Sequence, residues 1–325
     1  MHRRPFLQRA AIGAAAFLCS GLLLAQGAYP TRPVTLVVPN PPGGLVDTSA
    51  RLLGDTLSKV LGQTIIVDNR GGASGNVAYG LVSRAQPDGY TLLTSYSAYH
   101  VGNPWLMTKL PWAQKDFTPV ALITVATNVI TVHPSVPANN LQEFIAYLKK
   151  NPGKLSYASQ GNGSVSHIGT EMFKAQTGTS MVHIPYKGSG DAIRDVLSGQ
   201  VQVFMSTPPS VMQHVQSGKL KAFAVTGKTR HPGLPQVPTT AEAGLKGFEL
   251  ESWVAIFAPA GTPPDVVQKL TVAIQQALDT PEAKARADAA GIELRYLPPA
   301  RLGELVKEET AFWGKTIKER GITAD

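Results

Sequence analysis

The stretch "VVPNPPGGLVDTSARLLGDTL", residues 37–57, decides the fold class. A β-branched run ends in two prolines and two glycines, and an amphipathic helical pattern follows at once, which is typical of a strand-to-helix corner. The corner contains no Lys, His or Cys. Free N–H groups at a helix start and the helix dipole favour an anion without a charged side chain, so we interpret the corner as a backbone anion site. For a single corner, ordinary turn chemistry is the simpler explanation.

Short apolar strand patterns alternate with helical patterns along the whole chain, which predicts an α/β fold. Because these strands are rich in Val, Ile and Leu, we expect mostly parallel sheets flanked by helices. The predicted strands cover 33–39, 64–69, 90–95, 128–134, 155–159, 181–188, 201–206, 220–227 and 249–259. The predicted helices cover 45–62, 75–90, 140–154, 164–178, 191–200, 210–218, two segments within 262–291, and 299–321.

Two extended segments, near 123–130 and 249–258, are interpreted as crossings between two lobes. This predicts that lobe 1 consists of residues 29–125 and 251–325, with residues 126–250 inserted between them as lobe 2. Two α/β lobes joined by two crossover strands form a hinged cleft in which a ligand can bind.

Residues 1–28 are predicted to be a secretory signal that is removed on export to the periplasm. A basic head is followed by an apolar run over 10–25 and then by small residues. The order Arg3-Arg4-Pro5-Phe6-Leu7 is similar to a twin-arginine signal. Removing this segment takes away three Arg, no acid and the single Cys, so the expected mature chain has a net charge of 27 − 22 = +5.

Several classes of function are not expected from the residue patterns. The positive charge is mild and forms no run of Lys and Arg with interleaved aromatics, so no nucleic-acid partner is expected. No H-E-x-x-H, C-x-x-C or close pair of acids is present, so neither a metal site nor acid–base catalysis is predicted. The segment "VTGKT" (225–229) resembles the tail of a P-loop, but Ala222 stands where the first glycine is needed.

Six corners at the predicted carboxyl ends of strands share a composition of Gly, Ser, Thr and Asn. Ligands of parallel α/β sheets bind at this edge. Tyr96 and Tyr99 lie in the third corner, where they could touch the ligand or pack in the core. The candidate ligand-binding residues are Gly43, Gly44, Leu45, Asp47, Ser74, Gly75, Asn76, Ser95, Ser97, His100, Ser159, Gly163, Ser164, His167, Tyr186, Lys187, Ser206 and Thr207.

An exported serine hydrolase is the alternative to a binding protein. His100, His167 or His183 could join a serine and an acid in a catalytic triad. No G-x-S-x-G nucleophile elbow is present. The simpler interpretation is that these histidines lie in the core or at helix starts and make one hydrogen bond each.

The motifs "YPTRPVTLVVPNPPGGLVD", "VDNRGGASGN", "QPDGYTLL", "KDFTPVALI", "LSYASQGNGSVSH", "VHIPYKGSGDA" and "FAPAGTPPDVVQKL" occur in this order. In them the chain resembles the Bug (TctC-type) family, the periplasmic substrate-binding proteins of tripartite tricarboxylate transporters. The resemblance runs from Tyr29 to about Ile322. It implies a type II Venus flytrap that closes on a small carboxylate, needs no cofactor, catalyses nothing, acts as a monomer and serves the membrane subunits of a transporter.

The resemblance also implies how the ligand is held. One carboxylate would bind backbone N–H groups of the first corner and ordered waters. The residues that match the family motifs are Gly43, Gly44 and Asp47 in the first corner; Ser74, Gly75 and Asn76 in the second; Ser159, Gly163, Ser164 and His167 in the fourth; and Tyr186, Lys187 and Gly188 in the fifth.

Two departures from the family pattern bear on the ligand. Ser206-Thr207 stands where the family often has Asp-Asn, which removes a partner for an ammonium group, and the third corner is unusually aromatic. We therefore hypothesise an aromatic or extended dicarboxylate of the terephthalate kind rather than an amino acid. A ligand-presenting component of a sensor is an alternative that the sequence does not separate from transport.

Overall fold

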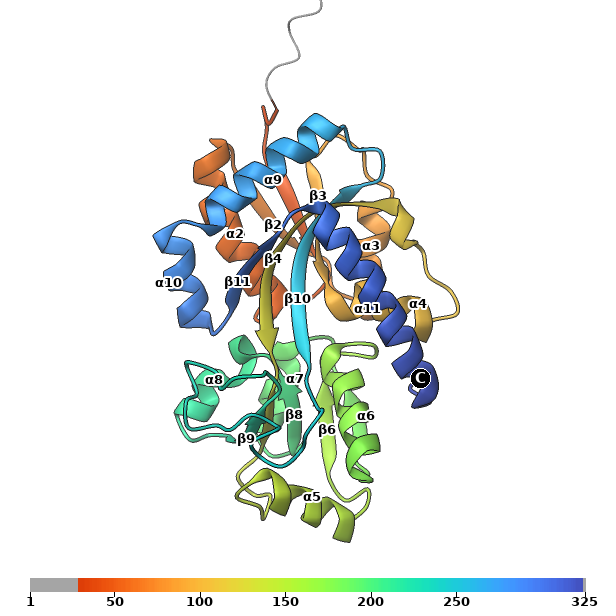
Figure 1. Ribbon diagram of the computed structural model, residues 1–325, viewed down its shortest axis with the longest axis vertical. Coiled ribbons are helices and arrows are strands. Elements are labelled where there is room, and N and C mark those ends of the chain that lie inside the picture. The colour runs from red at the N-terminus through yellow and green to blue at the C-terminus, as the bar shows by residue number, and fades with distance from the viewer. Residues whose placement is uncertain (1–28, 324–325) are drawn as a thin grey trace, which may run out of the picture.

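The computed structural model describes residues 29–323, which form two lobes joined by two crossing strands (Figure 1). The predicted signal segment, residues 1–28, lies outside the described residues. Lobe 1 is built on a six-stranded sheet in the order β11-β4-β10-β3-β1-β2. Its strands are β1 (Val34–Val38), β2 (Ile65–Asn69), β3 (Thr91–Tyr96), β4 (Phe117–Thr127), β10 (Glu251–Pro259) and β11 (Glu293–Leu297). Its helices are α2 (Leu45–Leu61), α3 (Asn76–Val82), α4 (Asn103–Leu106), α9 (Pro264–Leu278), α10 (Pro281–Ala290) and α11 (Pro299–Glu319).

Lobe 2 is built on a five-stranded sheet in the order β7-β6-β8-β5-β9. Its strands are β5 (Val129–Val132), β6 (Ser156–Ser159), β7 (Val182–Pro185), β8 (Val203–Ser206) and β9 (Lys221–Val225). Its helices are α5 (Leu141–Lys150), α6 (Val165–Thr177), α7 (Ser189–Leu197) and α8 (Pro208–Gln216). No helix within residues 29–323 is long and apolar enough to cross a membrane.

Both sheets are mixed, whereas the sequence patterns predict mostly parallel ones. The pairs β1–β2, β1–β3, β6–β7 and β6–β8 are parallel. The strands near the crossing pair antiparallel: β10 with β3 and β4, β4 with β11, and β5 with β8 and β9. Two neighbouring parallel strands have to be joined by a long crossover connection. β4 and β10 instead run between the lobes in opposite directions (Figure 1), so they pair directly with each other.

Hydrogen bonds join the two crossing segments at the point where they pass between the lobes. The chain leaves β4 at Thr127 and enters β5 at Val129, with Asn128 between them. The Asn128 N–H donates to Thr226 Oγ1 at 2.8 Å, and the Thr226 hydroxyl donates to the Leu250 carbonyl at 2.5 Å. We call Asn128, Thr226 and Leu250 the hinge tie. It fixes both segments at one level between the lobes.

Helix α2 shows how the sequence positions the first corner. Leu52, Leu53 and Leu57 lie on its inner face and are buried, and burial of each contributes about 1.5–3 kcal/mol. The helix packs against α9 and β2. This anchoring holds the helix start, capped by Gly44, beyond the carboxyl end of β1.

Candidate ligand-binding site

Two helix starts from opposite lobes meet where the lobes approach each other. Helix α2 begins at Gly44 and helix α7 begins at Gly188, and among the described residues neither has a side-chain cap. A Cβ at Gly44 would lie 2.8 Å from Ser189 Oγ, and a Cβ at Gly188 would lie 2.9 Å from Pro41 Cδ. The lobes therefore touch through glycine corners. Two positive helix ends facing each other are stabilised by an anion between them.

Asp47 supports the first corner from behind. Its carboxylate accepts hydrogen bonds from the Gly43 N–H at 3.1 Å, from Asn69 Nδ2 at 3.0 Å and from Arg51 Nε at 3.1 Å. These partners all belong to lobe 1. The sequence predicts that Asp47 contacts the ligand. In the structure its carboxylate oxygens instead accept hydrogen bonds from lobe 1, which hold the first corner in its shape.

The second corner supplies backbone rather than side chains. Gly75 has φ +83°, and a Cβ there would lie 2.5 Å from the Tyr99 ring, so the position requires glycine. Asn76 points into lobe 1, where its Oδ1 accepts from Trp112 Nε1 at 2.7 Å and its Nδ2 donates to Met107 Sδ at 3.0 Å. The predicted contact through the Asn76 side chain is therefore not supported. The Ser74 carbonyl accepts from the amide of Asn103 at 2.9 Å.

The third corner is mostly core. Ser95 Oγ lies 2.7 Å from the Tyr79 hydroxyl, and Ser97 Oγ accepts from the Trp253 N–H at 3.2 Å. His100 is 1% exposed and stacks on Phe257 at 4.4 Å, and burial lowers its pKa to about 3. The ligand contacts predicted for Ser95, Ser97 and His100 are thus replaced by contacts within lobe 1, because the chain turns into a π-helical segment at Ala98–Gly102 that buries the histidine.

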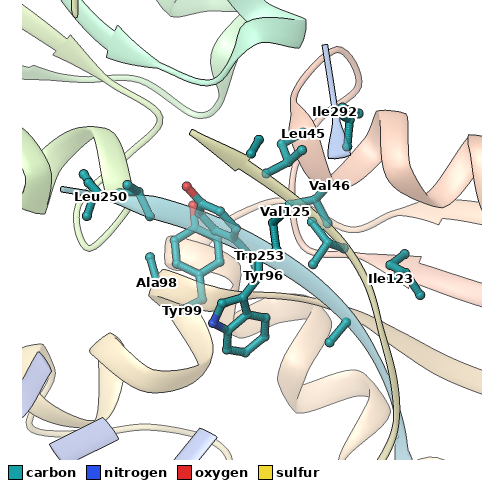
Figure 2. Close-up of a cluster of buried hydrophobic side chains, with 14 of the residues drawn as sticks. Leu45, Val46, Tyr96, Ala98, Tyr99, Ile123, Val125, Leu250, Trp253 and Ile292 are labelled. Carbon is teal, nitrogen blue, oxygen red and sulfur yellow. The ribbon is translucent and has the colours of Figure 1, made fainter. Parts of the chain in front are cut away.

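Two tyrosines of this corner reach the boundary between the lobes. The rings of Tyr96 and Tyr99 lie 5.1 Å apart, edge to face, and Figure 2 shows both phenol oxygens on the side of lobe 2. Asn40 Nδ2 donates to the Tyr99 hydroxyl at 3.3 Å. Burial raises the pKa of Tyr99 to about 12, so the phenol stays neutral. Asn40 Oδ1 is buried and has no hydrogen-bond partner within residues 29–323.

The fourth and sixth corners form one hydrogen-bonded group in lobe 2. Ser164 caps helix α6 by accepting from the His167 N–H at 3.3 Å. Gln160 Nε2 donates to Ser206 Oγ at 3.1 Å, which links the two corners. Thr207 is 1% exposed and begins helix α8, and its Oγ1 has no partner in the described part of the chain.

The fifth corner lies partly against lobe 1 and partly at the surface. The Tyr186 hydroxyl donates to Asp195 Oδ2 at 2.7 Å, within lobe 2, and Lys187 is exposed. Leu45 is a buried core residue at the first turn of α2. The structure thus gives Tyr186 and Leu45 internal partners, and the part of this corner that meets lobe 1 is the backbone of Gly188.

The sequence patterns did not single out three residues at the junction. Asn40 lies within the first corner, but its residue type predicts only a turn. Ser189 follows Gly188 and touches the first corner. Asn103 Oδ1 lies 2.8 Å from the place of a Cβ at Gly163, and its Nδ2 donates to the Ser74 carbonyl, so Asn103 lies between the second corner and the fourth. No sequence signal places Asn103 there, because the π-helical turn before it sets its direction.

Two α/β lobes joined by two crossing strands, with polar corners of both lobes meeting between them, are the architecture of bilobed solute-binding proteins. Residues 49–322 match the family model described as tripartite tricarboxylate transporter family receptor, TctC. Protein BugT of Bordetella pertussis (strain Tohama I) is 35% identical over 295 residues, which cover 90% of each chain. The chain belongs to the TctC family.

Solved structures show the same fold. The periplasmic binding protein BugD is 36% identical with a TM-score of 0.87, covering 91% of this chain and 99% of its own. Rpa4515 of R. palustris with adipate is 35% identical with a TM-score of 0.88, again covering 91% and 99%. MatC of Rhodopseudomonas palustris with bound malate is 34% identical with a TM-score of 0.84, covering 89% and 100%.

These relatives are binding proteins, so the hydrolase alternative is wrong and the chain is a binding protein rather than an enzyme. Its geometry agrees with that assignment. The serine–histidine pair formed by Ser159 and His183, at 2.7 Å, has its serine fully buried. Within residues 29–323 no three side chains of His, Cys, Asp or Glu gather as a metal ion requires.

Proposed function

We propose that this chain, as a monomer in the periplasm, captures a small carboxylate by lobe closure and delivers it to the membrane subunits of a tripartite tricarboxylate transporter. The single observation that carries this proposal is the meeting of the starts of α2 and α7, which have glycine caps and no side-chain cap among the described residues. A carboxylate bound at these two helix starts accepts hydrogen bonds from N–H groups of both lobes. It therefore binds the closed form more tightly than the open one.

The energy of such contacts is sufficient. Each charge-assisted hydrogen bond contributes about 1.5–3 kcal/mol, so three or four of them give micromolar affinity after the costs of ordering. The buried, unpartnered Thr207 Oγ1 and Asn40 Oδ1 offer polar contacts from lobe 2 and lobe 1 for the rest of the ligand.

For the ligand we propose an extended dicarboxylate, with terephthalate as the aromatic candidate. Two observations support this choice: Tyr96 and Tyr99 line the junction, and a hydroxyl pair, Ser206 and Thr207, stands at the sixth corner. The related protein crystallised with adipate adds that the fold accommodates a six-carbon dicarboxylate.

The test is isothermal titration calorimetry of refolded residues 29–325 with adipate, malate, terephthalate, benzoate and glutamate. Refolding removes any copurified ligand. Micromolar, one-to-one binding of a dicarboxylate is expected. The absence of a binding signal with every acid up to about 1 mM would refute carboxylate capture. Tight binding of glutamate with none of terephthalate or adipate would refute the ligand class while leaving the capture mechanism standing.

A further inference from the structure

We propose that His183, which lies outside the predicted site, is a positioning residue that holds the glycine loop of the fourth corner in its binding geometry. We call residues 160–163 the glycine loop. This loop meets lobe 1, because the place of a Cβ at Gly163 is 2.8 Å from Asn103 Oδ1. The effect on affinity rests on the proposed function; the effect on the loop does not.

Three rings are stacked behind the glycine loop. The His183 ring lies between Tyr157, at 4.8 Å and 14°, and His167, at 4.3 Å and 13°. His183 comes from β7, Tyr157 from β6 and His167 from the first turn of α6. The stack therefore joins the edge of the sheet to the helix that begins at the loop.

Hydrogen bonds connect the two imidazoles to the loop backbone. Ser159 Oγ accepts from the Gly161 N–H at 3.2 Å and lies 2.7 Å from His183 Nε2. We assign the serine hydroxyl as the donor and His183 Nε2 as the acceptor, because Ser159 Oγ already accepts from the Gly161 N–H. His167 Nδ1 accepts from the Gly163 N–H at 3.2 Å. Both imidazoles thus act as acceptors on the loop side.

Acceptor nitrogens require neutral rings. Protonation of His183 Nε2 would turn it into a donor and force the Ser159 hydroxyl to rotate away, and protonation of His167 Nδ1 would oppose the Gly163 N–H. Burial lowers the pKa of His183 to about 4, and burial also lowers the pKa of His167 below its usual range. Both rings are therefore neutral near pH 7, and the loop is held.

The charged groups around the stack come from α6. Glu171 favours protonation of both rings, whereas Lys174 opposes it. These two groups form an ion pair at 2.7 Å, and the Tyr157 hydroxyl donates to Glu171 at 2.5 Å. The carboxylate is thus neutralised by its own partners, which leaves burial as the main influence on the rings.

The experiment compares two variants that separate the hydrogen bond from the stack. His183→Phe keeps the ring stack but removes the acceptor, whereas His183→Gln keeps an acceptor oxygen but removes the aromatic ring. His214→Gln, at the end of α8, is the matched control. Nitrogen-15 NMR of the wild-type histidine rings and hydrogen exchange of the Gly161 amide are measured without ligand at pH 7. Adipate affinity is measured from pH 7 to pH 4.

We expect an unprotonated His183 Nε2 at pH 7 in the wild type. The Gly161 amide should exchange at least about fivefold faster in His183→Phe than in the wild type, with His183→Gln within about twofold. Adipate affinity should fall at least about fivefold in His183→Phe at pH 7. On acidification the wild-type affinity should fall more steeply than that of His183→Gln, in which adipate still takes up protons but residue 183 does not.

A protonated Nε2 at pH 7, or unchanged Gly161 exchange in His183→Phe, would overturn the proposal. If wild-type protein binds no acid, the proposed function fails, but the NMR and exchange results still decide whether His183 positions the loop. If His183→Phe does not fold, NMR of the histidine rings and exchange of the Gly161 amide are compared between wild type and His183→Gln. The Gly161 amide of His183→Gln must then retain the slow exchange of the wild type.

Discussion

Replacing Gly44 with alanine is expected to weaken ligand binding while leaving the fold nearly unchanged. Gly44 has φ −104° and ψ −179°, which alanine adopts without strain. Alanine is a slightly poorer helix cap than glycine, at a cost below about 1 kcal/mol. The new Cβ would lie 2.8 Å from Ser189 Oγ, an atom of the opposite lobe. This contact exists only when the lobes meet, so its cost falls on the closed form.

The magnitude follows from the two atoms involved. Overpacking of a fitted contact costs about 1–3 kcal/mol. Because a serine hydroxyl can rotate away, we take the lower half, about 1–2 kcal/mol. That cost corresponds to an increase in Kd of about 5- to 30-fold. Thermal unfolding without ligand should change little.

The assay is calorimetric titration with adipate and malate at pH 7, with Ser189→Ala as the matched partner. Removing the hydroxyl leaves Ser189 Cβ, at 3.8 Å from the new methyl group, as an ordinary contact. The double variant should therefore bind within about twofold of Ser189→Ala alone. Wild-type affinity in Gly44→Ala would refute the lobe contact. A double variant as weak as Gly44→Ala would show that the methyl group obstructs the ligand itself.

Three further outcomes test the scaffold. Gly75→Ala adds strain at φ +83° and a collision with Tyr99, so urea unfolding should show a loss of at least about 2 kcal/mol; a loss below about 0.5 kcal/mol would contradict the close approach. Thr226→Val leaves the buried Asn128 N–H without its acceptor and removes one of the two hydrogen bonds to the Leu250 carbonyl, which keeps the bond from Asn128 Nδ2, so we expect a loss of about 1–3 kcal/mol in the same assay, and a neutral result would mean that the tie is not formed. Burial raises the pKa of Glu309, which accepts a hydrogen bond from Trp253, from 4.5 to about 7. Between these two pH values the native state keeps a proton that the unfolded chain loses, so the free energy of unfolding falls as pH rises from 4.5 to 7. Glu309→Gln should remove up to about 3 kcal/mol of that decline, and unfolding curves that stay parallel across this pH range would contradict it.

The sequence predicts the first corner well because the information there is local. Prolines and glycines end β1, and the apolar period of α2 begins at once, so propensity and pattern agree. The long β10 is also predicted, since "ELESWVAIFAP" is apolar over more residues than a single-lobe strand needs. A helix is predicted over 75–90, but α3 ends earlier, at Val82.

Other features depend on tertiary contacts that no local pattern carries. The short, half-exposed β11 was not predicted, because its residues alternate weakly. His100 and Asn76 look like ligand groups by composition, yet Phe257 packs on His100 in the core and Trp112 donates a hydrogen bond to the half-buried Asn76. His183 was predicted to make a single ordinary hydrogen bond, and only the stack with His167 shows what that bond controls.

The hinge tie also bears on how such a protein can be built from parts. Lobe 2 enters and leaves lobe 1 at neighbouring points, because Thr127 pairs with Glu251 at the ends of the antiparallel strands β4 and β10. A two-residue turn placed there would close β4 and β10 into an ordinary hairpin and leave the order of the six strands unchanged. We infer that lobe 2 is an insertion with both of its ends at one place in lobe 1, which makes a chimaera with a foreign lobe 2 a route to altered ligand choice.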